Sequence, residues 1–411
     1  KIGQPQVIGE MVAGILLGPS LLGWLAPGVS AALFPLESLG FLNALSQMGI
    51  LIFMFVIGLE LKPQALRGRG YAALITSQAG IVAPFLLGML LALYLYPRLS
   101  EDGVTFTNFA LFVGTAMSIT AFPVLARILA ERNLLRTQVG IVAIACAAVD
   151  DVTGWCILAA VILLVRASAV ETPLWLTLLG SVSYIAVMLF VVRRALFRLD
   201  GIYRRRGAIG QDTMALIFLL VLVSALTTEW LGIHALFGAF LLGAIMPKEP
   251  DFVHALTEKL EHITVVLLLP LFFAFTGLRT SIGLVSGAQL WFYCALIITV
   301  AIAGKFGGVT LVARATGMPW REASTVGILM NTRGLMELVV LNIGLDIGVL
   351  SPTLFAMMVL MALFTTFITA PLLQWVYFGQ FFPQEVGAGQ RSRLWRLKNY
   401  GMRLRLNWRN K

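Results

Sequence analysis

The chain has 411 residues, of which 59% are hydrophobic and only 12% are charged, whereas a soluble protein carries about 25% charged residues. This composition excludes a soluble globular protein and indicates an integral membrane protein. Its apolar stretches are much longer than the roughly 10-residue alternating strands of a membrane barrel, so they predict an all-α polytopic membrane protein. The three cysteines, Cys146, Cys156 and Cys294, lie in apolar runs and predict neither a disulfide framework nor a metal site.

Hydropathy and helix-breaking residues predict twelve membrane segments. The first contains Gly14 and Gly18, a spacing that can bring helices close together. The eighth is short, and the ninth begins with an amphipathic stretch, 251–262. In chain order the segments are 6–24, 38–61, 70–96, 106–131, 137–166, 173–198, 209–230, 233–247, 252–278, 287–316, 319–344 and 352–378.

The basic residues predict how these segments are oriented. If residue 1 is cytoplasmic, most lysines and arginines fall in cytoplasmic loops or in the tail, and the opposite loops hold Arg98, Arg166 and Arg279. The positive-inside rule favours this arrangement. We therefore expect residue 1 and the C-terminus in the cytoplasm, and the protein in the cell (plasma or inner) membrane. The basic tail, 379–411, is expected to lie on anionic lipid headgroups rather than to bind nucleic acid.

Two adjacent carboxylates, Asp150 and Asp151, interrupt the apolar segment 137–166. One charge at the centre of a membrane helix costs about 2.5–3.5 kcal/mol, which favours a functional interpretation over a purely structural one. Asp150 lies about 20 Å along its segment, and Lys305 and Asn331 lie at similar depths in later segments. Because neighbouring residues of a helix point about 100° apart, one aspartate can face Lys305 while the other faces a cavity.

Two segments are predicted to be broken at mid-membrane. The stretch 114–123 combines small and hydroxyl residues and ends at Pro123, which cannot donate to the helix ladder. The stretch 330–334 combines polar residues with a glycine. Paired breaks of this kind indicate a transporter binding site, and we favour that interpretation over a plain proline kink. For Arg333 and Glu337 we favour a structural ion pair at i,i+4 spacing.

These residue types suit a site for an alkali cation. Two buried carboxylates resist ionising together, and with a nearby lysine they titrate as a coupled set. A dehydrated alkali cation needs oxygen ligands, which Asp150, Asp151, Ser118, Thr120 and the carbonyls freed at the first break can supply. A cation and protons would compete for this site, and moving the site across the membrane in either state gives exchange. The residues predict a monovalent cation/proton antiporter, not an enzyme, with no cofactor beyond the transported Na⁺ or K⁺ and H⁺.

Five stretches also carry a resemblance to a known family. The chain resembles the monovalent cation/proton antiporters, specifically the second cation/proton antiporter family, over essentially its whole length. Within that family it is most similar to plant and fungal cation/proton exchangers and their bacterial relatives. The stretches are 3–10, 55–61, 118–127, the pair Asp150-Asp151, and 330–338.

The resemblance implies an inverted-repeat antiporter fold in which the broken helices near Thr120 and Asn331 cross. It also implies a homodimer and an elevator-like movement of core helices against a scaffold. A further helix would precede the first segment, giving thirteen in the full protein and placing its N-terminus outside. The core would comprise 70–166 and 287–378, and the scaffold and dimer helices 1–61 and 173–278.

The resemblance also implies roles for single residues. By position, Asp151 is similar to the family's cation-binding carboxylate, and Asp150 to the partner of Lys305 in an ion pair that forms and breaks during transport. Family members with paired aspartates tend to be electrogenic, and plant exchangers usually have Asn where this chain has Asp150. That departure favours Na⁺ or Li⁺ over K⁺. The supporting residues at the breaks would be Pro123, Asn331, Arg333 and Glu337.

Several alternatives remain open from the sequence. Potassium/proton exchange, electrogenic or electroneutral, is the alternative within antiporters. A cation channel would not need Lys305 opposite the carboxylates. A sodium-coupled solute symporter shares broken helices but requires an organic solute, and an intramembrane protease takes its two aspartates from different helices. The sequence leaves open the cation, the coupling ratio, the pH dependence and the residue that carries the proton.

Overall fold

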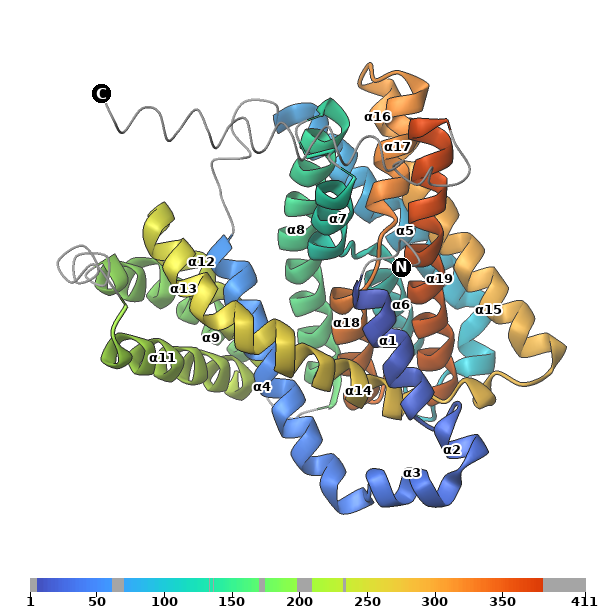
Figure 1. The fold of residues 1–411 in the computed structure, drawn as a ribbon, viewed down its shortest axis with the longest axis horizontal. Coiled ribbons are helices and arrows are strands. Elements are labelled where there is room, and N and C mark those ends of the chain that lie inside the picture. The colour runs from blue at the N-terminus through green and yellow to red at the C-terminus, as the bar shows by residue number, and fades with distance from the viewer. Residues whose placement is uncertain are drawn as a thin grey trace, which may run out of the picture.

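A computed structural model describes residues 6–60, 70–132, 134–135, 137–169, 174–197, 209–231 and 234–379. Every regular element in these ranges is helical, which confirms the all-α prediction (Figure 1). The basic tail after residue 379 lies outside the described residues. The α-helices are α1 (Gln6–Leu17), α2 (Leu22–Leu25), α3 (Pro27–Leu33), α4 (Leu36–Glu60), α5 (Gly70–Leu99), α6 (Phe106–Ser118), α7 (Phe122–Glu131), α8 (Gln138–Ala169), α9 (Leu174–Val187), α11 (Gln211–Trp230), α12 (Ala235–Ile245), α13 (Pro250–Ile263), α14 (Leu269–Arg279), α15 (Gly287–Ile302), α16 (Gly308–Ala315), α17 (Trp320–Met330), α18 (Leu335–Asp346) and α19 (Pro352–Phe378).

The described residues do not confirm all twelve predicted membrane segments. Within the described ranges, nine helices are long and apolar enough to cross a membrane, or ten if the bent pair α17–α18 forms one span. The predicted segment 106–131 is divided into α6, with 13 residues, and α7, with 10, and the predicted segment 233–247 contains α12, with 11 residues. None of these helices is long enough to cross alone. The twelve-segment count and the inverted repeat therefore stay predictions.

The helices fall into two groups (Figure 1). Helices α9, α11, α12 and α13 lie on one side of the molecule, and α5 to α8 lie with α15 to α19 on the other. Helices α4 and α14 run between the two groups, and α1 is drawn in front of the second group in this view. The second group contains the expected core segments, 70–166 and 287–378. Movement of this group against the rest is an expectation from the family resemblance.

Glycines bring α1 into backbone contact with α14. A Cβ added at Gly14 would lie 2.2 Å from the carbonyl oxygen of Phe273, and one added at Gly18 would lie 2.3 Å from that of Gly277. Real Cβ atoms do not approach so closely, so neither position accepts a larger residue without moving a helix. The spacing of Gly14 and Gly18 does bring helices together here.

Lys248 joins the C-terminal ends of α4 and α12. These two helices cross in backbone contact, since a Cβ at Gly58 would lie 2.2 Å from the carbonyl oxygen of Phe240. Next to the crossing, Lys248 Nζ donates to the carbonyl oxygens of Gly58 and Leu59, at 2.8 Å each, and of Gly243 at 3.0 Å. A cation at this position suits the partial negative charge at both helix ends.

Titration of Lys248 should make the free energy of unfolding rise with pH in the alkaline range. Burial, together with the nearby charge of Arg193, lowers the pKa of Lys248 from 10.5 to about 8. Between these values the unfolded chain keeps a proton that the folded chain has lost, so this residue adds to the free energy of unfolding as pH rises from about 8 to 10.5. Thermal unfolding midpoints of the wild type and of Lys248→Met in detergent should therefore diverge across this range, in favour of the wild type. Parallel profiles for the two proteins would contradict this account.

A polar network joins α14 to the far end of α18. Arg279 Nη2 pairs with Asp346 Oδ1 at 2.6 Å, and Arg279 Nη1 donates to Asn342 Oδ1 at 3.2 Å. Asn342 Nδ2 donates in turn to Thr276 Oγ1 at 3.0 Å. A cavity of about 10 Å³ lies beside this network and is also lined by Ser46 of α4; it has room for about one water molecule.

Candidate functional site

Two breaks in the helices meet inside the second group. Residues 119–121 separate α6 from α7, and residues 331–334 separate α17 from α18 with a bend of 44°. Pro123 stands in the first turn of α7, where a missing N–H costs nothing. The backbone N–H of Ala121 donates to the carbonyl oxygen of Thr332 at 3.0 Å. Both breaks expected from the sequence are present, and they touch each other.

Asp150 accepts hydrogen bonds on both of its carboxylate oxygens. Oδ1 accepts from the hydroxyl of Ser77 on α5 at 2.8 Å. Oδ2 accepts from the hydroxyl of Thr120 at 2.5 Å and from Lys305 Nζ at 2.8 Å, and the side chains of this ion pair are each 1% exposed. The Thr120 hydroxyl also lies 3.2 Å from the carbonyl oxygen of Met330. Because that hydroxyl has a single hydrogen, it donates to one of these acceptors at a time.

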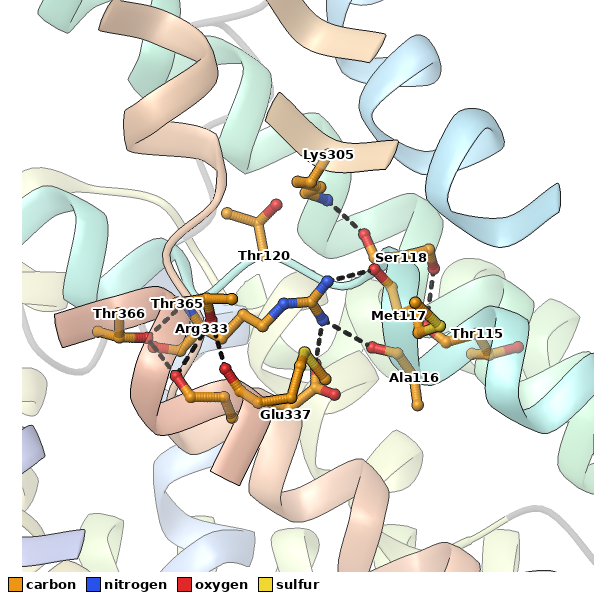
Figure 2. Close-up of polar contacts among 12 residues, drawn as sticks. Thr115, Ala116, Met117, Ser118, Thr120, Lys305, Arg333, Glu337, Thr365 and Thr366 are labelled. Atoms are coloured by element: carbon orange, nitrogen blue, oxygen red, sulfur yellow. Dashed lines mark hydrogen bonds and ion pairs between the residues drawn. The ribbon is translucent and has the colours of Figure 1, made fainter. Parts of the chain in front are cut away.

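Two cations close the C-terminal end of α6. Arg333 Nη1 and Nη2 donate to the carbonyl oxygens of Ala116 at 3.0 Å and Met117 at 2.6 Å, and Lys305 Nζ donates to that of Ser118 (Figure 2). The last carbonyls of a helix lack partners within the helix and carry a partial negative charge. The break after α6 therefore creates an electronegative end that both cations neutralise.

Arg333 has a second set of contacts within its own break. Its Nη1 pairs with Glu337 Oε2 at 2.9 Å, with both side chains essentially unexposed (Figure 2). The i,i+4 pair expected from the sequence is thus present. Thr366 of α19 bridges the backbone at the same place, since its hydroxyl accepts from the N–H of Arg333 at 2.9 Å and lies 2.6 Å from the Arg333 carbonyl oxygen. Such hydroxyls satisfy the backbone groups that a broken membrane helix leaves free.

Comparison with known families decides what kind of protein carries this arrangement. The sequence profile described as "Sodium/hydrogen exchanger, transmembrane" matches residues 1–378. The chain belongs to this family. It is therefore an integral membrane protein of a transporter family, and cation/proton exchange is the activity for which that family is named.

Individual relatives differ in the cation that their names state. The chain is 45% identical to "Na(+)/H(+) antiporter NhaS4" of Synechocystis sp. over 92% of both chains. It is 44% identical to "Cation/H(+) antiporter 17" of Arabidopsis thaliana, over 91% of this chain and 45% of that protein. It is 36% identical to "K(+)/H(+) antiporter 1" of Saccharomyces cerevisiae, over 91% of this chain and 45% of that protein. The chain thus spans less than half the length of these plant and yeast proteins.

A solved structure has the same fold. The sodium proton antiporter MjNhaP1 of Methanocaldococcus jannaschii matches with a TM-score of 0.62 over 91% of each chain. Only 15% of the aligned residues are identical, so this likeness concerns the fold of the exchanger and not its site residues.

The two adjacent carboxylates of this exchanger, Asp150 and Asp151, differ in the hydrogen bonds that they accept. Both carboxylates are buried, but Asp151 Oδ1 accepts no hydrogen bond from the described residues. Two other buried oxygens at the breaks, Asn331 Oδ1 and Glu337 Oε1, also accept no hydrogen bond from the described residues. A buried oxygen without a donor is costly. Such an oxygen is a ready ligand for a cation or a proton.

Ser118 has two contacts at the exchanger's site. Its hydroxyl, which the sequence proposes as a cation ligand, donates to the carbonyl oxygen of Thr115 at 2.8 Å and keeps its lone pairs. Its backbone carbonyl accepts from Lys305. Binding of the cation by Ser118 and Thr120 stays a prediction.

Three features of the exchanger's site are not predicted from the sequence. Ser77 and Thr366 contact the site from α5 and α19, and Lys305 lies in a single π-helical turn, Ala303–Gly307. Such turns occur frequently at functional sites. Sequence signals existed: Ser77 belongs to a polar triplet, 76–78, in an apolar helix, and glycines surround Lys305.

Proposed function

We propose that the chain is a secondary active antiporter that exchanges a monovalent cation, Na⁺ or Li⁺, for protons at Asp151. The observation that carries this proposal is the contrast between two adjacent carboxylates. Asp150 accepts from Ser77, Thr120 and Lys305, while Asp151 Oδ1 accepts from none of the described residues. Both oxygens of Asp150 are thus occupied by protein donors, and Asp151 has spare capacity for a cation or a proton.

Exchange follows if the cation and the proton compete for Asp151 and only an occupied site crosses the membrane. We place the moving core at 70–166 and 287–378 and the scaffold at 1–61 and 173–278, in an elevator-type mechanism within a homodimer. The contact between the two breaks supports a common site carried by one body. Electrogenic exchange is proposed because the chain has the pair Asp150-Asp151, and family members with paired aspartates tend to be electrogenic.

The choice of cation rests on the carboxylate pair and on one relative. The protein named as a Na⁺/H⁺ antiporter is 45% identical and matches over 92% of both chains. Potassium/proton exchange is the second candidate, because the yeast protein named as a K⁺/H⁺ antiporter is 36% identical over 91% of this chain. We place the protein in the cell membrane with its basic loops in the cytoplasm.

The decisive experiment uses purified protein in liposomes with an imposed pH gradient. Proton flux is followed on adding Na⁺, Li⁺ or K⁺, with and without a potassium ionophore to clamp the membrane potential. We expect exchange by the wild type and its loss in Asp151→Asn, because the amide cannot take up a proton or supply a charge. Asp212→Asn, at an exposed position in the first turn of α11, should exchange like the wild type.

The same assay, together with current recordings in planar bilayers and cation-uptake measurements, separates the alternatives. Full exchange by the Asp151→Asn variant would contradict the proposal that Asp151 binds the cation. A response to K⁺ alone would favour potassium/proton exchange. Unitary currents would indicate a channel, and cation uptake that depends on an added organic solute would indicate a symporter. No response of the wild type to any of the three cations would overturn antiport itself.

A further inference from the structure

The three side chains that donate to Asp150 differ in the number of acceptors available to them, and Ser77 has the fewest. Lys305 also donates to the carbonyl oxygen of Ser118, and the Thr120 hydroxyl has a second acceptor at Met330. For Ser77, the described part of the chain provides a single acceptor, Asp150 Oδ1 at 2.8 Å. Thr120 can therefore exchange one acceptor for the other, and Lys305 divides its hydrogens between two acceptors, while Ser77 donates to Asp150 alone.

The direction of the Ser77 side chain is itself unusual. A serine within a helix commonly donates to the carbonyl four residues earlier in the same helix. Ser77 instead donates across to α8, and it is completely buried. Because Ser77 donates to a carboxylate on another helix and not to its local carbonyl, we infer that its orientation serves the hydrogen bond to Asp150.

The packing of α5 fixes Ser77 relative to Lys305. A Cβ at Gly304 would lie 2.8 Å from Pro84 Cα, and one at Gly308 would lie 2.7 Å from Ala83 Cβ. Helix α5 therefore touches the π-helical turn of Lys305 almost backbone to backbone. The two donors approach the two oxygens of Asp150 from neighbouring, tightly packed elements.

We propose that Ser77 is a positioning residue that keeps Asp150 out of the cation's coordination, so that the site has one carboxylate rather than two. This inference rests on the proposed exchange and adds a determinant of cation affinity to it. With the Ser77 hydrogen bond in place, Asp150 Oδ1 is occupied by a donor. Without it, Oδ1 becomes a second buried carboxylate oxygen that lacks a donor, on the residue that precedes Asp151 in α8.

Removal of the Ser77 hydroxyl should therefore tighten cation binding and slow turnover. A hydrogen bond to a charged group corresponds to about a ten-fold change in an equilibrium constant. We expect Ser77→Ala to lower the KM for the cation about ten-fold, since the cation gains a second anionic ligand. We expect kcat to fall as well, because a more tightly held cation leaves more slowly.

The test measures KM and kcat at one pH in liposomes for the wild type, Ser77→Ala and Ser77→Thr, using whichever of Na⁺, Li⁺ and K⁺ gives the largest wild-type response. Ser77→Thr keeps the hydroxyl and should restore the wild-type KM. Ser46→Ala removes another buried serine, on α4, and should leave both constants unchanged. Calorimetric titration of the same cation into purified protein should show the same order of affinities without transport.

The outcomes separate this inference from the proposed function. Wild-type exchange with a KM for Ser77→Ala that is unchanged or higher would overturn the role of Ser77 alone. Absence of exchange and of cation binding in the wild type would overturn both. If Ser77→Ala does not fold, Ser77→Cys replaces the hydroxyl by a thiol, which is a weaker donor. The KM of Ser77→Cys should then be lower than that of the wild type, and an equal KM would count against the inference.

Discussion

Arg333→Met should destabilise the protein by about 3–5 kcal/mol, the usual cost of removing one partner of a buried ion pair. Two losses add together here. Glu337 remains buried without its partner, and the carbonyl oxygens of Ala116 and Met117 lose their donors at the end of α6. We expect a large fall in the thermal unfolding midpoint in detergent, together with loss of exchange in liposomes.

The chain contains a matched control for this change. Arg127 and Glu131 have the same i,i+4 spacing and a similar separation of 3.1 Å, but their side chains are 41% and 45% exposed. Arg127→Met should cost no more than about 1 kcal/mol, as for exposed pairs in general. The double variant Arg333→Met/Glu337→Gln should recover part of the lost stability, because no buried charge is then left alone. Equal effects of Arg333→Met and Arg127→Met would refute the proposed importance of burial.

The second large effect is expected at the Asp150–Lys305 pair. Asp150→Ala leaves the ammonium of Lys305 buried at 1% exposure, and Lys305→Met leaves the carboxylate with Ser77 and Thr120. Each single change should cost about 3–5 kcal/mol, and the double variant should cost clearly less than the sum. All three variants should lose coupled exchange, because Asp150 is then missing or unpaired.

A double-mutant cycle on thermal unfolding measures this coupling directly. The Arg279–Asp346 pair offers a comparison, since its side chains are 24% and 38% exposed. The coupling there should be smaller because water screens the charges. Additive effects of Asp150→Ala and Lys305→Met would contradict a direct interaction between the two residues.

Local features of the fold were accessible from the sequence. Composition predicted helices, and prolines, glycines and polar clusters predicted both breaks. Depth along the segments predicted that Asp150 and Lys305 could meet, because rise per residue is constant in any helix. The Arg333–Glu337 pair was accessible for the same reason, since i,i+4 spacing is a property of a single helix.

Contacts that depend on the rotation of one helix against another were not accessible. Ser77 and Thr366 are ordinary polar residues of long helices until α5 and α19 are placed against the breaks. The same holds for the carbonyl contacts of Arg333, which join segments more than two hundred residues apart. The number of spans is also not settled by hydropathy, because an apolar segment can be a short helix such as α12 or one that crosses the bilayer.

The network between α14 and α18 has a consequence for the speed of transport. Arg279 holds both Asp346 and Asn342, and Asn342 holds Thr276, so three polar contacts tie one helix to the other. If α18 travels with the core while α14 stays with the scaffold, these contacts must part once in every cycle. The network then contributes to the activation enthalpy of the crossing step. The C-terminal end of α18, opposite the break at 331–334, would thereby limit the rate of turnover.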